Sequence, residues 1–201
     1  MDKFNNQYRI SSARLAGYDY GQNGAYFITI CTKNRIHYFG EIVDRKMILN
    51  EIGNLAHEYW QEIPNHFSYI ELANFVVMPN HIHGILIIYK NTDNGYDRTL
   101  QVDIPSVETL QGFSVETLQC NVSTDTVKNQ KMAEISPKSG TISSIIRSYK
   151  SIVTKHARYI KPEFEWQSRF HDHIIRNEPS FNNIQNYIEN NPANWKQDNF
   201  F

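Results

Sequence analysis

Two histidines stand two residues apart in the stretch NFVVMPNHIHGILII, residues 74 to 88. The stretch consists of two apolar runs joined by Met-Pro-Asn, and His81 and His83 open the second run. Residues i and i+2 of a β-strand point to the same face, so the two imidazoles project together, about 7 Å apart. With a third ligand from elsewhere they can bind one metal ion. The pattern equally fits two hydrogen-bonded structural histidines at the end of a sheet.

A second pair of histidines has the same spacing. His171 and His173 flank Asp172 in a short run that also has strand character. The run supports a polar site on the sheet, and it opens a rival hypothesis. In that hypothesis both histidine pairs, 81–83 and 171–173, form the site of a phosphodiesterase that works without a covalent intermediate.

A tyrosine and an asparagine form the third candidate group, in NNIQNYIENNP, residues 182–192. Tyr187 and Asn191 are four residues apart, so they are neighbours on one face of a helix. An amide oxygen is a suitable ligand for a hard cation, and a phenol is a potential nucleophile. The alternative is that Tyr187 packs in the core, as we expect for Tyr149 in the apolar stripe of another helix.

Hydrophobic periodicity predicts the elements that position these residues. The alternation of strands and helices predicts an α+β fold: a ferredoxin-like antiparallel sheet flanked by helices. We expect a single domain, 1–201, in which strands 67–77 and 81–89 form an antiparallel hairpin. The other predicted elements are a strand at 25–32, a helix at 46–62 ended by Pro64, a helix at 141–160, a strand at 169–176 and a helix from about Ser180 to Pro192.

The segment 90–138 differs in character from the rest of the chain. It is polar, and it contains SVETLQ twice, starting at Ser106 and at Ser114. No helical or strand period is sustained in it. We therefore predict a flexible insertion, and we assign no chemistry to it.

The bulk composition sets limits on the class of protein. The chain has 201 residues, 40% of them hydrophobic, with a formal net charge of −1. Its apolar runs are far shorter than the roughly 20 residues that span a bilayer, and its N-terminus has no apolar stretch suited to secretion. Two cysteines are too few for a disulfide framework. These features predict a cytoplasmic protein that does not enter a membrane.

The charges are unevenly distributed along the chain. Residues 101–126 contain four acidic residues and no Lys or Arg, whereas residues 141–161 contain no acidic residue. A local cationic surface can bind phosphates even when the whole protein is nearly neutral. The alternative is an ordinary solvated helix face. The cations in question are Arg147, Lys150, Lys155, Arg158 and Lys161.

The motifs together resemble a known family. MPNHIHGIL resembles the histidine–hydrophobic–histidine motif of the HUH single-tyrosine transposases (IS200-like transposases), and NYIENNP resembles the helix that carries their nucleophile. WQSRFHDHIIRNE is similar to a stretch typical of the REP-associated tyrosine transposase branch. The order of the motifs also agrees. The resemblance covers roughly residues 20–90 and 139–195.

The resemblance implies roles for individual residues. It implies that His81 and His83 are ligands of a divalent metal ion, Mg²⁺ or Mn²⁺. Asn191 is then the third ligand, where other members of the wider family use Gln, and Tyr187 is the nucleophile. His173 matches a recurrent position, and Asp172 stands where this branch often has Glu. Both residues are therefore expected near the metal.

The resemblance also implies an activity. We expect an enzyme that cleaves and rejoins single-stranded DNA through a 5′-phosphotyrosine intermediate, at hairpin or repeat sequences. The helix face with Arg147, Lys150, Lys155 and Arg158 is expected to hold the DNA backbone. The protein is expected to act as a monomer or a homodimer. A non-enzymatic alternative is a domesticated protein that binds DNA hairpins without cleaving them.

Overall fold

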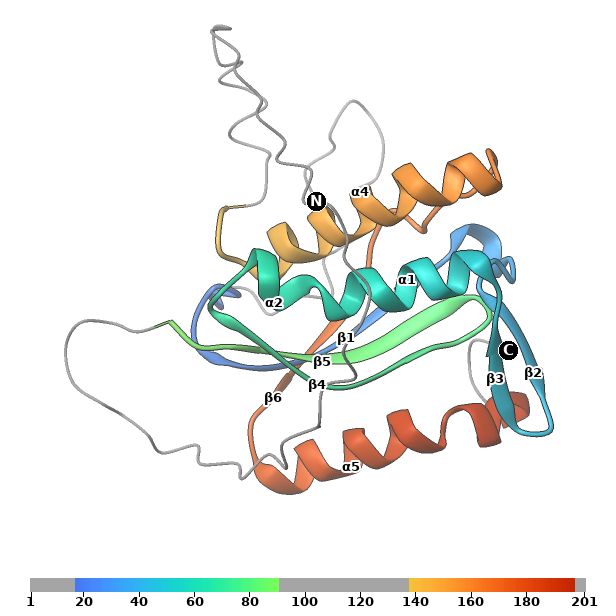
Figure 1. The fold of residues 1–201 in the computed structure, drawn as a ribbon. Coiled ribbons are helices and arrows are strands. Elements are labelled where there is room, and N and C mark those ends of the chain that lie inside the picture. The colour runs from blue at the N-terminus through green and yellow to red at the C-terminus, as the bar shows by residue number, and fades with distance from the viewer. Residues whose placement is uncertain (1–16, 91–137, 198–201) are drawn as a thin grey trace, which may run out of the picture. The chain divides into compact units, whose positions relative to one another are not determined.

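The computed structural model describes residues 17–90 and 138–197, which form a four-stranded antiparallel sheet, a two-stranded hairpin and flanking helices (Figure 1). The predicted insertion lies almost wholly outside these residues. The elements are β1 (Gly24–Cys31), η1 (Lys33–Arg35), β2 (Gly40–Val43), β3 (Lys46–Leu49), α1 (Glu51–Gln61), α2 (Ile63–His66), β4 (Ile70–Val77), β5 (His81–Ile88), α4 (Ile142–Ile160), β6 (His171–Ile175), α5 (Glu178–Asn190) and η2 (Pro192–Gln197).

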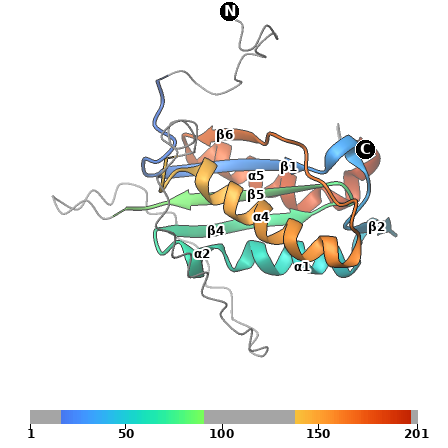
Figure 2. The same ribbon diagram turned by 90° about the horizontal axis from the view of Figure 1, so that it is seen from above.

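The strand order of the larger sheet is β4-β5-β1-β6, and every neighbouring pair is antiparallel. Helix α1 lies between β1 and β4 in the chain, and α4 lies between β5 and β6. This is the βαββαβ arrangement of a ferredoxin-like fold, which confirms the predicted fold class. Helices α1 and α4 contact each other on one face of the sheet, and α5 covers the other face (Figure 2).

The alternation of side chains along the strands divides the core into two layers. Tyr26, Ile28 and Ile30 of β1 are fully buried in the layer formed with α1 and α4. On the opposite face, Ile85 of β5 packs with Ile188 of α5 in a smaller cluster. The histidine pair of β5 shares the face of Ile85, so it lies on the α5 side of the sheet, as the strand pattern predicts.

Close packing at one glycine joins β5 to α1. A Cβ atom on Gly84 would lie 2.4 Å from Cζ2 of Trp60, which is closer than two carbon atoms can approach. The indole therefore occupies the space that any larger residue at position 84 would need. This contact fixes how near the first helix comes to the strand that carries the histidines.

The predicted helix over 46–62 is wrong at its N-terminal end. Lys46–Leu49 forms strand β3 of a hairpin with β2, and the helix begins only at Glu51. Asn50 marks the boundary, because its side chain accepts a hydrogen bond from the backbone N–H of Gly53. This is the usual cap of a helix N-terminus. Pro64, predicted to end the helix, lies in the first turn of the short helix α2 instead.

The later elements lie close to their predicted positions. Helix α4 starts after the cap residue Thr141, and α5 starts at Glu178 because Asn177 caps it by accepting from the N–H of Ser180. Nζ of Lys90, just beyond β5, donates to the carbonyl of Gly140 at 2.8 Å, just before α4. Over the described ranges, no helix is both long enough and apolar enough to cross a membrane.

Candidate active site

His81 and His83 lie side by side at the start of β5. Their ring centroids are 4.4 Å apart, and their side chains are 0% and 1% exposed. Strand β5 follows the turn Met78–Asn80 directly, and the antiparallel pairing with β1 places His81 opposite Cys31 and His83 opposite Thr29. The two rings therefore lie at one end of the sheet, on the face that helix α5 covers.

Helix α5 brings Tyr187 to this pair. The Tyr187 hydroxyl lies 3.2 Å from Nε2 of His83, within hydrogen-bond distance. Phe27 of β1 stacks on His83 and meets the Tyr187 ring edge to face, so the phenol and the imidazole are held by a common neighbour. Tyr187 is 43% exposed whereas the histidines are buried. Its ring thus lies where the site opens to solvent.

Each histidine has a polar partner at its Nδ1 atom. Oδ1 of Asn80 lies 2.8 Å from Nδ1 of His81, and Oγ1 of Thr29 lies 2.9 Å from Nδ1 of His83. A histidine that binds a metal through one ring nitrogen usually donates a hydrogen bond through the other, which orients the ring. Both rings are supported in this way, so both are suited to ligation through Nε2.

Asn191 stands one helical turn beyond Tyr187, at the C-cap of α5, and its side chain is 2% exposed. The next segment, η2, packs onto the pair, because Trp195 stacks on His81 with ring centroids 5.8 Å apart. Two buried imidazoles and an amide oxygen are ligand types that suit a small divalent ion. Among the described residues, no three His, Cys, Asp or Glu side chains form such a group.

Burial determines the charge of His81. Desolvation by the surrounding protein, together with the smaller effects of the neighbouring His83 and Arg35, lowers the pKa of His81 to about 2. The ring is therefore neutral at physiological pH. A neutral imidazole retains a lone pair on one nitrogen, which is the form that binds metals.

Strand β6 places its polar residues differently from what we predicted. Asp172 pairs in register with Ile28, whose side chain belongs to the core under α1 and α4. Asp172 therefore faces away from His81 and His83, contrary to its expected position near the metal. His173 does lie on the α5 face, opposite Phe27. His171 of β6 pairs with Thr29 of β1, and Thr29 pairs with His83 of β5, so His171 and His83 lie on either side of Thr29 across the sheet.

The predicted basic residues line a groove on the other side of the sheet. Arg147, Lys150, Lys155 and Arg158 of α4 form one wall of this groove, which has a volume of about 1030 Å³. Nζ of Lys150 donates to the carbonyl of Gln167, and burial lowers the pKa of Lys150 to about 8. The residues that complete the groove are Thr32, Lys33, Asn34, Arg35, Ser151, Thr154, Glu165, Trp166, Gln167 and Ser168.

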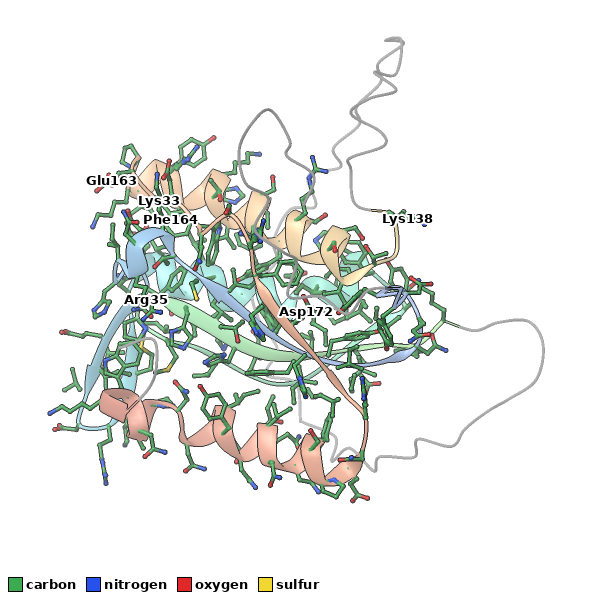
Figure 3. All side chains as sticks on the ribbon, turned by 180° about the vertical axis from the view of Figure 1, so that it is seen from behind. Lys33, Arg35, Lys138, Glu163, Phe164 and Asp172 are labelled. Carbon is green, nitrogen blue, oxygen red and sulfur yellow. The ribbon has the colours of Figure 1, made fainter. Side chains whose placement is uncertain are left out.

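The groove and the histidine pair meet at the same end of the sheet. Strand β1 ends at Cys31, opposite His81, and the next residues, Thr32 to Arg35, line the groove. Figure 3 shows that Lys33 lies on the α4 side of this turn and Arg35 on the side of α5. The turn η1 therefore connects the two faces.

Several residues at the site were not predicted. Thr29 contacts His83 because of the register between β1 and β5, and Trp195 contacts His81 because of the path of η2. Neither the register nor this path can be predicted from the sequence pattern. Asn80 could have been suspected, since it directly precedes His81. Asn74 was also missed: it accepts from Gln185 and donates to Glu189, and these two residues flank Tyr187 on α5.

The comparisons with known proteins agree with this architecture. No family model matches the chain. A REP-associated tyrosine transposase bound to a REP hairpin has a similar structure, with a TM-score of 0.51 and 19% identity over 92% of this chain and 74% of that chain. An uncharacterized protein from Haemophilus influenzae is 37% identical over 194 residues, which are 94% of this chain and 92% of the relative. The chain therefore has the fold of a REP-associated tyrosine transposase and belongs to the same protein family as the Haemophilus influenzae relative.

Proposed function

We propose that the protein is a transposase-like enzyme that cleaves and rejoins single-stranded DNA, at hairpin or repeat sequences, through a 5′-phosphotyrosine at Tyr187. The observation that carries this proposal is the 3.2 Å contact between the Tyr187 hydroxyl and Nε2 of His83. It joins a helix near the end of the chain to a buried histidine pair 104 residues earlier. An exposed phenol next to buried metal-type ligands is suited to attack on a phosphodiester.

The chemical step follows from the position of Tyr187. Its Oη attacks the phosphorus, a bond forms between Oη and phosphorus, and the bond from phosphorus to the 3′ oxygen breaks. The phenol gives up its proton, the 5′-phosphate of the downstream fragment remains on the tyrosine, and the 3′ oxygen of the upstream fragment takes up a proton and leaves as a hydroxyl. Attack by the same or another 3′-hydroxyl reverses the step. Because the phosphotyrosine conserves the phosphodiester bond, strand transfer needs no other source of energy.

His81, His83 and Asn191 would hold the divalent ion, Mg²⁺ or Mn²⁺. When bound, such an ion neutralises negative charge on the phosphate oxygens. The chain supplies the orientation: Asn80 and Thr29 hold the two imidazoles at Nδ1. Burial keeps His81 neutral, with a pKa of about 2.

The basic groove supports DNA as the substrate. Its described residues include six cations, Lys33, Arg35, Arg147, Lys150, Lys155 and Arg158, and a single acidic residue, Glu165. Trp166 is the one aromatic residue among them, and it packs against Phe39 and Phe164 rather than standing free for base stacking. Such a lining favours contact with the phosphates of a hairpin stem over stacking on single-stranded bases. The similar structure named above is bound to a hairpin.

The direct experiment is incubation with end-labelled single-stranded and hairpin DNA in the presence of Mn²⁺. We expect a covalent protein–DNA adduct that resists denaturation, and mass spectrometry should place the nucleotide on Tyr187. Tyr187→Phe should abolish the adduct. Tyr159→Phe is the matched control, because Tyr159 is 78% exposed on α4, outside the candidate site.

The same experiment separates the alternatives. An adduct that persists in Tyr187→Phe would remove Tyr187 from the mechanism. Hairpin binding without any adduct would favour the non-enzymatic protein. Hydrolysis that survives Tyr187→Phe but is lost in His173→Ala would favour the phosphodiesterase with two histidine pairs.

A further inference from the structure

Asn80 joins the basic groove to the histidine pair through its carbonyl and both polar atoms of its side-chain amide. Its carbonyl accepts from the backbone N–H of Thr32 at 2.9 Å and from Oγ1 of Thr32 at 3.0 Å. Its side-chain Nδ2 donates to the carbonyl of Arg35 at 3.2 Å, and its Oδ1 lies 2.8 Å from Nδ1 of His81. The residue is 1% exposed.

These contacts determine which nitrogen of His81 carries the proton. The carbonyl of Arg35 can only accept a hydrogen bond, so the amide group of Asn80 must turn its Nδ2 towards Arg35. Its Oδ1 then faces His81. An amide oxygen carries no proton, so Nδ1 of His81 must be the donor. The neutral ring therefore has its proton on Nδ1 and its lone pair on Nε2.

We propose that Asn80 is a positioning residue that holds His81 in the Nδ1–H tautomer and aligns the histidine pair with the turn that lines the groove. The tautomer follows from the hydrogen bonds alone. The part that concerns metal binding rests on the function proposed above. Asn80 does not touch the reacting atoms in this proposal; it acts through His81 and through the turn Thr32–Ile36.

The turn needs the support that Asn80 gives. Asn34 and Arg35 both have positive φ angles, 54° and 55°, which non-glycine residues rarely adopt. The carbonyl of Asn80 and the hydroxyl of Thr32 hold the first half of the turn, and Nδ2 of Asn80 holds the second half at Arg35. Removal of the Asn80 side chain leaves its backbone carbonyl bonded to Thr32. Such a variant therefore keeps the hydrogen bonds that hold the first half of the turn.

The first test measures the tautomer in metal-free protein, by NMR of ¹⁵N-labelled histidine. The wild type should show a protonated Nδ1 and an unprotonated Nε2 on His81. Asn80→Ala should move the equilibrium towards Nε2–H, and Asn80→Asp, which keeps an acceptor oxygen, should restore Nδ1–H. Thr32→Val is the matched control, since it removes a hydroxyl from the same turn without removing the acceptor at His81.

The second test measures Mn²⁺ affinity by titration calorimetry. Asn80→Ala should weaken binding by about 10- to 100-fold, the usual cost of losing such a supporting partner. Asn80→Asp should restore most of it, and Thr32→Val should change it less than Asn80→Ala does. Urea unfolding of each variant establishes that it is folded.

Two results would overturn the role of Asn80: a wild-type His81 protonated on Nε2, or equal Mn²⁺ affinities in Asn80→Ala and Thr32→Val. A wild type that binds no Mn²⁺ would overturn the proposed metal site instead. The tautomer measurement would still decide the role of Asn80 in that case.

Discussion

The Tyr187 hydroxyl contacts Nε2 of His83, the nitrogen through which this residue would hold the proposed metal ion. The hydroxyl lies 3.2 Å from this nitrogen. Thr29 occupies Nδ1, so Nε2 is the nitrogen left for a ligand. One ring nitrogen cannot bind a metal ion and share a hydrogen bond with a hydroxyl at the same time. The tyrosine therefore has to leave His83 when a metal ion binds there, which frees its oxygen for chemistry.

Tyr187→Phe should consequently tighten Mn²⁺ binding, because the competing hydroxyl is gone. One hydrogen bond has a net value of about 0.5–1.5 kcal/mol, so we expect an affinity increase of about 2- to 10-fold. Titration calorimetry measures it, with Tyr159→Phe as the control. Weaker binding in Tyr187→Phe would show that the hydroxyl is itself a ligand.

Asn74→Ala should slow adduct formation without affecting the metal. Asn74 lies in an irregularity of β4 between Leu72 and Phe75, and it accepts from Gln185 at 3.0 Å and donates to Glu189 at 2.5 Å. Loss of both hydrogen bonds loosens α5 by roughly 1–2 kcal/mol, which predicts a decrease in the rate of about tenfold.

Asn190→Ala is the matched control for this change, since the side chain of Asn190 bonds only within its own helix, to the carbonyl of Asn186. Adduct formation is followed in gels over time, and Mn²⁺ affinity is measured separately. A fall in Mn²⁺ affinity together with the rate would mean that Asn74 supports the whole site rather than the position of Tyr187.

DNA binding should weaken as the pH rises through about 8. Burial lowers the pKa of Lys150 from 10.5 to about 8, so its ammonium loses its charge there. The arginines of the groove stay charged in this range. Between pH 7 and 9, the hairpin affinity of the wild type should therefore fall towards that of Lys150→Gln, whose affinity should change little. A parallel fall in both proteins would assign the pH dependence to another group.

Gly84→Ala should destabilise the fold, because the added Cβ would lie 2.4 Å from Cζ2 of the fully buried Trp60. Overpacking of this kind costs about 1–3 kcal/mol in the free energy of unfolding, measured in urea. The same substitution in a Trp60→Phe background should cost less, because a smaller ring leaves room. Equal costs in the two backgrounds would show that the clash is relieved elsewhere.

The sequence predicted those parts of the fold whose signal is local. The stripe of α4 and the alternation in β5 follow from periods of 3.6 and 2, and both elements appear where they were expected. The helix prediction was wrong for residues 46–50 because Ile48 and Ile52 stand four residues apart, which is the spacing of one helix face. Pairing with β2 prevails there, as the register of Ile48 with Glu41 shows.

The site could be predicted only where its residues repeat at a regular spacing. Spacing made His81, His83 and Tyr187 candidates, the resemblance to a known family gave them roles, and the structure brings Tyr187 to His83. Asp172 and His173 are neighbours on a strand and point to opposite faces, so they cannot both lie near the metal, and alternation alone does not show which face Asp172 takes. That face depends on the pairing of Asp172 with Ile28, a partner more than a hundred residues away. Thr29 was missed for the same reason.

The contact between Lys90 and Gly140 has a consequence for how this chain can be altered. Lys90 bonds to Gly140 at 2.8 Å and to the carbonyl of Gly21 at 2.6 Å, so the strand before the 91–137 segment is tied directly to the helix start after it. The two ends of this segment are therefore held together by described residues. A purification tag, a fluorophore or a fused domain placed between them should leave the contact from Lys90 to Gly140 in place.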